Sequence, residues 1–532
     1  MNRPMTWTFS ERNFLPFLKS ASILLLGTGI GILANIYSPT YVAIGTALFT
    51  LLCMSLYVLS SRGWATEEHP VMLEKQKNPL LFYLFYLAFF LSITIPKSGR
   101  TFANIPITTA NIVILCALVF WALRLAFSQE TLFSLPLAKP LLVFMLYGCF
   151  ALMVGLAHEN PTKIVILDFV AFIGFIPVYF LVCSVLRKPS QITKIVWTVV
   201  IALILVCAYG MLQKRFGPER IAIPGITEQY DLILYAHFGG RWNIIAGGGQ
   251  KLYSTFQNGN IFGHHLATFL PFIGGFFLGI RSTRKKTVLF GIFLFCCYIL
   301  ILTYSRGALA GTICGFMTLA LISKKIRLKA FIAIVAAFFL LLGLLWYYAD
   351  QPGMERYDVR KVSEDPNSFS AGRLERAQEV LKGFANLPMI DKIFGLGWGG
   401  ELISPKYWRF LYVDNLYLTF LFKLGIVGTL IFITILTQLL LKLLHYCRST
   451  TDPVIHGLLY GSIAGLVAAM VHNLADALWL FPPLAANFWF LAGISICIGM
   501  IAARQESAQQ KAETPPFDRL RTPQKTRIRR MR

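Results

Sequence analysis

Three arginines stand out because of where they occur in the chain. Arg306 lies between two long apolar runs, and Arg373 and Arg376 lie three positions apart in a hydrophilic stretch. A charged side chain deep in a bilayer costs about 2.5–3.5 kcal/mol on insertion scales, so Arg306 needs an anionic partner or a place at the membrane interface. A guanidinium group stays charged and offers a planar fork of donors that suits phosphate. If the three arginines meet, the sequence predicts a site for a polyanionic ligand.

Each arginine also has a plainer interpretation. Arg306 could be a snorkelling side chain that marks a helix end. Arg373 and Arg376 could form the solvated, charged flank of an amphipathic helix.

Groups that could take a proton occur near these arginines in the predicted topology. Asp414 directly precedes Asn415 at the start of a long apolar run, and His472 and Asp476 are four positions apart. We expect His472 and Asp476 to share a helix face, where the carboxylate orients the ring or pairs with it. Asp414 or His472 could act as a general base, and the amides of Asn260 and Asn415, with Asp476, could position substrate or acceptor.

The adjacent histidines His264 and His265 do not predict a metal site. Neighbouring helix positions point about 100° apart, which places two such rings poorly for sharing one ion. No HExxH motif or cysteine framework accompanies them, and such companions are typical of zinc sites. The sequence predicts neither a metal nor any other cofactor.

The composition is that of a polytopic membrane protein. Of the 532 residues, 56% are hydrophobic and 14% charged, against about 25% charged in ordinary soluble domains. Apolar runs of about 20 residues recur along the chain, each long enough to cross the hydrocarbon core of a bilayer. We predict an all-α, polytopic membrane protein with about 14 transmembrane helices and a large periplasmic loop containing short helices. The predicted spans are 18–37, 40–60, 79–96, 106–127, 138–157, 163–186, 192–213, 260–281, 285–303, 305–323, 327–348, 413–446, 455–477 and 482–503.

The distribution of the positive charge predicts the orientation. The formal net charge is +24, but the basic residues gather in alternate short loops, which excludes nucleic-acid binding as the simple explanation. With a cytoplasmic N-terminus, the positive-inside rule is satisfied at one boundary after another. The basic residues at these boundaries are Arg62, Lys75, Lys77, Arg187, Lys188, Arg281, Arg284, Lys285, Lys286, Lys324, Lys325, Arg327 and Lys329. The C-terminus is then cytoplasmic as well, and all the candidate site residues lie toward the far face.

These spans divide the chain into six parts. The predicted parts are N-terminal transmembrane helices (1–213), a periplasmic loop (214–258), central transmembrane helices (259–348), a large periplasmic loop (349–412), C-terminal transmembrane helices (413–503) and a basic, disordered cytoplasmic tail (504–532).

The large loop contains one clear helix signal. Helical spacing predicts a helix from Arg373 to Phe384. Its apolar stripe, expected to lie on the membrane domain, consists of Leu374, Ala377, Leu381 and Phe384. A glycine-rich turn follows at Phe394–Gly400, but it lacks the lysine and Ser/Thr of a P-loop, so we do not predict a nucleotide site there.

Several short motifs occur in a fixed order between Tyr253 and Leu480. They are Phe256-Gln257-Asn258-Gly259-Asn260, Phe269-Leu270-Pro271, Tyr304-Ser305-Arg306-Gly307-Ala308, Gly372-Arg373-Leu374, Gly395-Leu396-Gly397, Asp414-Asn415-Leu416-Tyr417-Leu418 and Gly425-Ile426-Val427-Gly428. In this order and topology the chain resembles the O-antigen ligase and polymerase superfamily of bacterial inner-membrane proteins.

The resemblance implies metal-independent glycosyl transfer at the periplasmic face of the inner membrane. A glycan held on undecaprenyl diphosphate passes to a lipid A-core sugar in a ligase, or to another lipid-linked glycan in a polymerase. Arg306 and Arg373 match arginines that hold the diphosphate in the family. Ligases typically carry a histidine before the asparagine of the Asp414-Asn415 pair, and Asp414 here favours a polymerase or another exopolysaccharide-transferring member. The implied partners are the lipid-linked glycan, the acceptor glycan or lipid A-core, and the bilayer, with no nucleic acid.

Two other classes of function remain open on the sequence. A membrane transporter of lipid-linked sugars or polysaccharide would more often carry ionisable groups near the midplane and repeated halves. Asp168 and Lys423 are the main charged residues inside predicted spans, and we find no convincing repeat. A structural subunit whose loops dock a partner is the third possibility.

Overall fold

The computed structural model describes residues 79–102, 105–126, 135–227, 251–323, 370, 372–400, 403–404, 409–410 and 413–513. The predicted spans 18–37, 40–60 and 327–348 lie outside the described residues. So do much of the two predicted periplasmic loops and most of the basic tail.

The described chain is a helical bundle with two short strand pairs. Strands β1 (Gly99–Phe102) and β2 (Ile105–Thr108) pair antiparallel, as do β3 (Ile403–Ser404) and β4 (Arg409–Phe410). The helices are α3 (Pro79–Thr94), α4 (Thr109–Ala126), α5 (Ala138–Ala157), α6 (Thr162–Phe172), η2 (Ile173–Phe175), α7 (Ile176–Val185), α8 (Pro189–Phe216), α9 (Gly259–Gly279), α10 (Thr283–Leu302), α11 (Arg306–Ile322), α15 (Arg373–Ala385), α16 (Met389–Phe394), α17 (Leu416–Ser449), α18 (Pro453–His472), η6 (Leu478–Leu480) and α19 (Pro482–Glu513).

Within the described residues, 8 helices are long and apolar enough to cross a membrane, and α3, α4 and α11 are shorter apolar helices. The helix positions agree with the predicted spans except at the last one. Helix α19 continues to Glu513, beyond the predicted end at residue 503, so residues 504–513 are helical and not the start of a disordered tail. The sixth span contains a break, because the 3₁₀ turn η2 separates α6 from α7 within the apolar stretch Thr162–Val185. The predicted count of about 14 spans is not tested, since three of them lie outside the described residues.

Helices α9, α11 and α18 pack closely through small residues. A Cβ added to Gly461 of α18 would lie 2.5 Å from the carbonyl oxygen of Phe272 in α9, and one added to Gly311 of α11 would lie 2.5 Å from the carbonyl oxygen of Ala468. Glycines at such positions let helix backbones approach each other, which is how apolar helices gain packing contacts inside a membrane. These contacts bring the ends of the three helices together.

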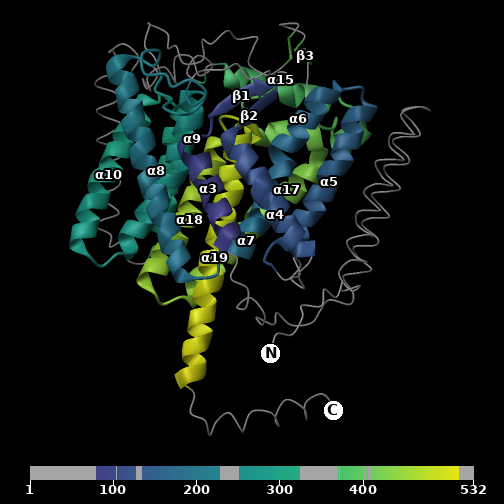
Figure 1. Ribbon diagram of the computed structural model, residues 1–532. Helices are drawn as coiled ribbons and strands as arrows, with labels where there is room; N and C mark the ends of the chain where they lie inside the picture. The colour runs from purple at the N-terminus through teal and green to yellow at the C-terminus, as the bar shows by residue number, and fades with distance from the viewer. Residues whose placement is uncertain are drawn as a thin grey trace, which may run out of the picture.

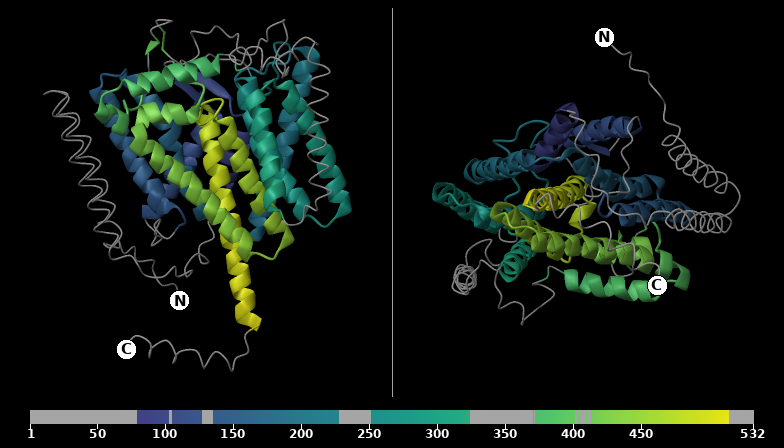
Figure 2. Two further views of the ribbon diagram at one scale, coloured as in Figure 1. Left: turned by 180° about the vertical axis from the view of Figure 1, so that it is seen from behind. Right: turned by 90° about the horizontal axis from the view of Figure 1, so that it is seen from below.

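One end of the bundle carries most of the polar side chains of interest, and we call it the α15 end. Here α9, α11, α17 and α19 begin and α10 and α18 end. The hydrogen bond from Leu416 N to Asn473 O at 3.0 Å joins the start of α17 to the end of α18. Helix α15 lies across this end, whereas α19 extends beyond the opposite end (Figures 1 and 2). The bundle therefore holds the N-terminal turns of several helices beneath a lid-like helix that carries two arginines.

Candidate functional site

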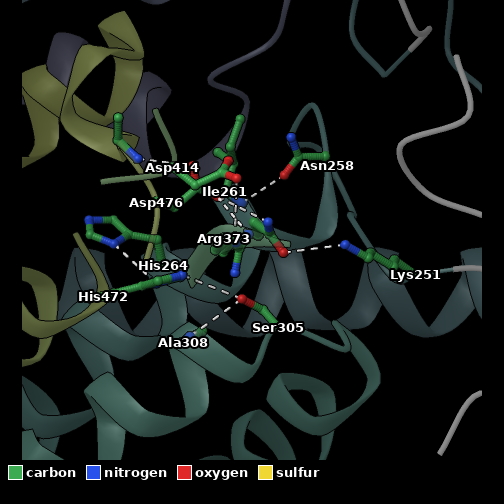
Figure 3. Close-up of polar contacts among 12 residues, drawn as sticks. Lys251, Asn258, Ile261, His264, Ser305, Ala308, Arg373, Asp414, His472 and Asp476 are labelled. Atoms are coloured by element: carbon green, nitrogen blue, oxygen red, sulfur yellow. Dashed lines mark hydrogen bonds and ion pairs between the residues drawn. The ribbon is translucent and has the colours of Figure 1, made fainter. Parts of the chain in front are cut away.

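The two arginines of α15 face two carboxylates from different parts of the chain. Arg373 Nε lies 3.6 Å from Asp414 Oδ2, and its Nη2 lies 3.7 Å from Asp476 Oδ2. Arg376 Nη2 forms a short ion pair with Asp414. Figure 3 shows Arg373 between these carboxylates and the start of α11 at Ser305. The structure therefore brings together four of the predicted site residues at the α15 end.

The helix predicted from Arg373 is confirmed, but its predicted apolar face is wrong in part. Phe384 packs as predicted, against Phe422 of α17, whereas Leu374 and Leu381 are exposed and Val380 is buried beside Phe384. Positions 373, 376, 380 and 384 follow helical spacing, so the face that holds the arginines is continuous with the packed face. The ion pairs with Asp414 and Asp476 account for this rotation of the helix.

A chain of polar contacts links Arg373 to α9. Asp476 Oδ2 accepts a hydrogen bond from Asn260 Nδ2 at 3.0 Å, and Asn260 Oδ1 accepts one from Lys251 Nζ at 3.4 Å. Lys251 was not predicted as a site residue, because a lysine in a loop before an apolar run carries no local signal. It adds a basic side chain to the cluster that contains Arg373.

Asp476 is the most buried acid of the site. Burial raises the pKa of its carboxyl to about 6, although the Arg373 guanidinium and the Asn260 amide act in the opposite direction. Its neighbour Asp414 adds a like charge that also raises this pKa. Asp476 therefore changes charge close to physiological pH, unlike an ordinary aspartate.

The prediction that His472 and Asp476 share a helix face is wrong. Helix α18 ends at His472, and Asp476 lies beyond it in the connection to η6. His472 is only 1% exposed, and a Cβ added to Gly307 would lie 2.6 Å from its ring. The capping turn at the end of α18 separates the two residues, so Asp476 faces Asn260 and Arg373 while His472 points into the bundle.

A buried hydrogen-bonded chain fixes the state of the His472 ring. Trp479 Nε1 donates to His264 Nε2 at 3.2 Å, His264 Nδ1 lies 3.3 Å from His472 Nδ1, and His472 Nε2 lies 3.4 Å from Ser305 Oγ. Indole nitrogen is only a donor, so His264 Nε2 must be the acceptor and His264 Nδ1 carries the proton. The proton of the neutral His472 is then on Nε2, directed at Ser305. In this arrangement both rings serve to connect α9, α11 and α18.

Arg306 begins α11 beside this chain. The residues on either side of it, Ser305 and Gly307, both contact or adjoin His472. Ser305 caps α11, with its Oγ accepting from Ala308 N at 3.4 Å. Arg306 is half-buried, and it occupies the first turn of a helix whose free N–H groups favour an anion.

Asn415 ties α17 to the end of α18. Its Oδ1 accepts from the backbone N–H groups of Tyr417 and Leu418 at 2.9 and 3.0 Å, and its Nδ2 donates to Leu474 O at 2.9 Å. It acts here as a helix cap that fixes the direction in which Asp414 enters the site.

The paired histidines of α9 turn to different neighbours. His264 joins the buried chain to His472, whereas the His265 ring packs between Phe256 and Phe269. In the part of the chain that the structure describes, no group of three or more His, Cys, Asp or Glu residues could hold a metal ion.

Comparison with known families adds to this geometry. Residues 291–433 match the family model described as O-antigen ligase. This part of the chain is similar to the O-antigen ligase family. The predicted membership of the O-antigen ligase and polymerase superfamily is thereby confirmed. No curated protein matched the chain in a further search.

The O-antigen ligase segment contains the central part of the site. Arg306, Arg373, Arg376 and Asp414 all lie within residues 291–433. Flanking helices bring Lys251, Asn260, His472 and Asp476 to the same end of the bundle. The family is one of glycosyltransferase-like O-antigen ligases and polymerases, which supports an enzyme, and together with the apolar helices it supports a bacterial membrane protein.

Proposed function

We propose that this protein transfers a glycan from undecaprenyl diphosphate to an acceptor hydroxyl at the α15 end of the bundle. The observation that carries the proposal is the pair of arginines on α15 that meet Asp414 inside the O-antigen ligase segment. Guanidinium groups bind phosphate, and a carboxylate beside them can take a proton from a hydroxyl.

The balance of charge at the site fits a diphosphate. The polar cluster joins the basic residues Lys251, Arg373 and Arg376 to the carboxylates Asp414 and Asp476, and Arg306 begins α11 beside it. A diphosphate joined to a lipid and a sugar carries two negative charges, and the leaving lipid diphosphate carries one more. Fixed guanidinium groups in a site of low polarity stabilise this developing charge, so the arginines supply it without a metal.

We assign Asp414 as the base. In the reaction the acceptor oxygen attacks the anomeric carbon of the donor glycan, Asp414 accepts the acceptor's proton, and the bond from the anomeric carbon to the diphosphate oxygen breaks. In the structure, Asp414 is paired with Arg373 and Arg376. Binding of the diphosphate to these arginines would release the carboxylate to face the acceptor.

The identity of residue 414 favours polymerisation. Resemblance to the superfamily implies a histidine at this position in ligases, whereas this chain has Asp414. We therefore favour a polymerase, or another exopolysaccharide-transferring enzyme, whose acceptor is a second lipid-linked glycan, over a ligase acting on lipid A-core.

The site is proposed to face the periplasm of a bacterial inner membrane. Lys285 and Lys286 lie at the opposite end of the bundle, at the start of α10, as the positive-inside rule requires of the cytoplasmic side. Transport of lipid-linked sugars is the alternative. Clustering of Arg373 and Arg376 with their acidic partners at one end favours the enzyme, since a transporter needs polar groups along a path through the membrane.

Transfer by the purified protein tests the proposal. Incubated with undecaprenyl-diphosphate glycan, the wild type should build longer chains on a gel, and added lipid A-core should stay unmodified. Arg373→Ala and Arg306→Ala should each lower kcat/KM by about 10²–10³-fold, because each removes fixed charge from the diphosphate.

Lys382→Ala is the matched control, because Lys382 is an exposed basic residue on the same helix α15. It should retain activity within about twofold, since surface charges of this kind contribute little. Normal products from both arginine variants would contradict the diphosphate site, and transfer to lipid A-core would instead identify a ligase.

A further inference from the structure

The glycine-rich turn singled out in the sequence is built into the interior of the bundle. We call residues Gly395–Gly400 the glycine segment. Four consecutive backbone N–H groups of this segment donate to other elements: Leu396 to Phe422 O at 2.9 Å, Gly397 to Lys423 O at 3.0 Å, Trp398 to Ala151 O at 3.1 Å and Gly399 to Asp168 Oδ2 at 2.9 Å. Irregular backbone between apolar helices requires such partners.

Glycine is required here by both conformation and space. Gly395, Gly397 and Gly399 have φ values of 83°, 77° and 76°, which L side chains rarely adopt. A Cβ on Gly395 would lie 2.5 Å from Gly425 N. The one large residue between them, Trp398, is fully buried and donates from Nε1 to Gly148 O at 2.9 Å.

A charged pair inside the bundle holds this segment. Asp168 of α6 and Lys423 of α17 are 5% and 7% exposed, and they form a short ion pair through Asp168 Oδ2. The same oxygen accepts the Gly399 N–H. The two residues lie in the apolar stretches Thr162–Val185 and Leu416–Ser449, each long enough to span a membrane, where charged groups are costly and occur with partners. The sequence showed these two charges but not that they meet.

The pair connects directly to the site through a short helical piece. Helix α17 breaks at Gly425, where φ is 65° and ψ is −172°, so residues 416–424 form a separate piece that begins next to Asp414. Phe422 in this piece packs on Phe384 of α15, and Leu424 O accepts from Tyr147 OH at 2.7 Å. Lys423 therefore lies in the piece 416–424, which packs against α15 and follows Asp414 in the chain.

We propose that Asp168 and Lys423 are positioning residues for the site. Their ion pair and the Asp168–Gly399 hydrogen bond hold the glycine segment and residues 416–424 together, and this fixes α15 so that Arg373 and Arg376 are preorganised for the diphosphate. The kinetic part of this inference rests on the proposed function, whereas the structural part does not.

Hydrogen exchange of the backbone amides tests the structural part on the full-length protein in detergent. In the wild type, the amides of 396–399 and of α15 should exchange slowly. Asp168→Ala removes the acceptor of Gly399 N–H and leaves Lys423 unpaired, so exchange of both segments should become at least tenfold faster. Ile166→Ala is the matched control on α6, because Ile166 is 48% exposed, and it should leave exchange unchanged.

Two further variants separate charge from the hydrogen bond. Lys423→Met leaves Asp168 buried without its cation and should also loosen both segments. The double variant Asp168→Asn/Lys423→Met has no buried charge and keeps an oxygen for Gly399 N–H, so it should recover most of the protection. If Asp168→Ala does not yield folded protein, these two variants still test the role of the ion pair.

Kinetics test whether the pair positions the arginines. In Asp168→Ala the KM for the lipid-linked donor should rise at least tenfold while kcat stays within about threefold, because every group that touches substrate is still present and binding must now order α15. The double variant should restore the KM. A purely structural role would reduce the yield of folded protein without changing the donor KM of the folded fraction.

Two results would overturn the inference: slow exchange of 396–399 in both single variants, or fast exchange with an unchanged donor KM. If the wild type shows no transfer, the proposed function fails. In that case hydrogen exchange of α15 alone tests the structural part of the inference. Unchanged protection of α15 in both single variants would contradict it.

Discussion

Asp414 and His472 differ in what they can reach. The Asp414 side chain is 14% exposed at the α15 end, whereas His472 is 1% exposed and its Nε2 is directed at Ser305. A general base must come within hydrogen-bond distance of the hydroxyl that it deprotonates. Asp414 meets this condition better, although both residues have the chemistry for the role.

Substitution of each residue should separate them. Asp414→Asn should lower kcat by about 10²–10⁴-fold, the range expected for loss of a general base, with the protein still able to bind the lipid-linked donor. His472→Gln should keep kcat within about tenfold and instead lower the Tm, because it disturbs a buried chain. The measurements are single-turnover transfer and thermal unfolding in detergent. A His472→Gln variant that is folded but inactive, beside an active Asp414→Asn variant, would reverse the assignment.

The raised pKa of Asp476 predicts a pH-dependent affinity for the donor. Ionised Asp476 competes with the diphosphate for Arg373, and protonated Asp476 does not. Because burial raises its pKa to about 6, the affinity should increase severalfold as the pH falls from 7.5 to 5.5. A diphosphate diester stays doubly charged over this range, so the ligand does not add its own titration.

Asp476→Asn tests this directly by titration calorimetry with a short-chain prenyl diphosphate sugar. The variant should bind with a Kd that hardly changes between pH 5.5 and 7.5. Asp391→Asn alters an acid of α16 that is paired with His158, at the end of α5, and this variant should keep the wild-type dependence. The same pH dependence in Asp476→Asn as in the wild type would show that another group controls it.

At the scale of the elements, close helix packing determines whether the site forms. The backbones of α9 and α18 touch at Gly461, and these two helices carry Asn260, His264 and His472. Gly461→Ala should therefore reduce stability by about 1–3 kcal/mol, the usual effect of overpacking, and should also weaken the contact between His264 and His472.

Gly291 of α10 offers a matched control for this substitution, because a Cβ there would meet nothing within 4 Å. Gly291→Ala should be neutral or slightly stabilising, as alanine favours a helix over glycine. Thermal unfolding of the two variants in the same detergent provides the comparison. Equal Tm values for both would contradict the importance of the α9–α18 contact.

At the scale of the whole molecule, the proposed orientation makes a prediction about access from the two sides of the membrane. A cysteine at Met389, which is 69% exposed on α16, should react with a membrane-impermeant maleimide from the periplasm. A cysteine at Gln505, exposed near the end of α19, should react only after the inner membrane is opened. The protein for this test needs its ten native cysteines replaced. The reverse pattern of labelling would invert the topology and place the site in the cytoplasm.

The sequence by itself determined the helical membrane architecture and the approximate ends of most of the long described helices, but not the breaks at η2 and Gly425 or the end of α19. A span such as α5 needs about 20 apolar residues in a row, and residues 138–157 meet this requirement within one continuous stretch of sequence. The same holds for the helix that begins at Arg373, whose spacing is visible along one stretch of chain. The resemblance to O-antigen ligases also rests on short motifs that can be read in order.

Only the tertiary structure decided which polar groups meet. Asn260 and Asp476 are 216 positions apart, and Asp168 and Lys423 are 255 apart, so no local pattern records these contacts. The rotation of α15 was mispredicted for the same reason. Apolar spacing alone favoured Leu374 and Leu381 as the inner face, but the carboxylates of Asp414 and Asp476 draw Arg373 and Arg376 inward and leave those leucines exposed. In a membrane protein an unpaired buried charge costs more than an exposed leucine, and the pairing of charges therefore determined the orientation of the helix.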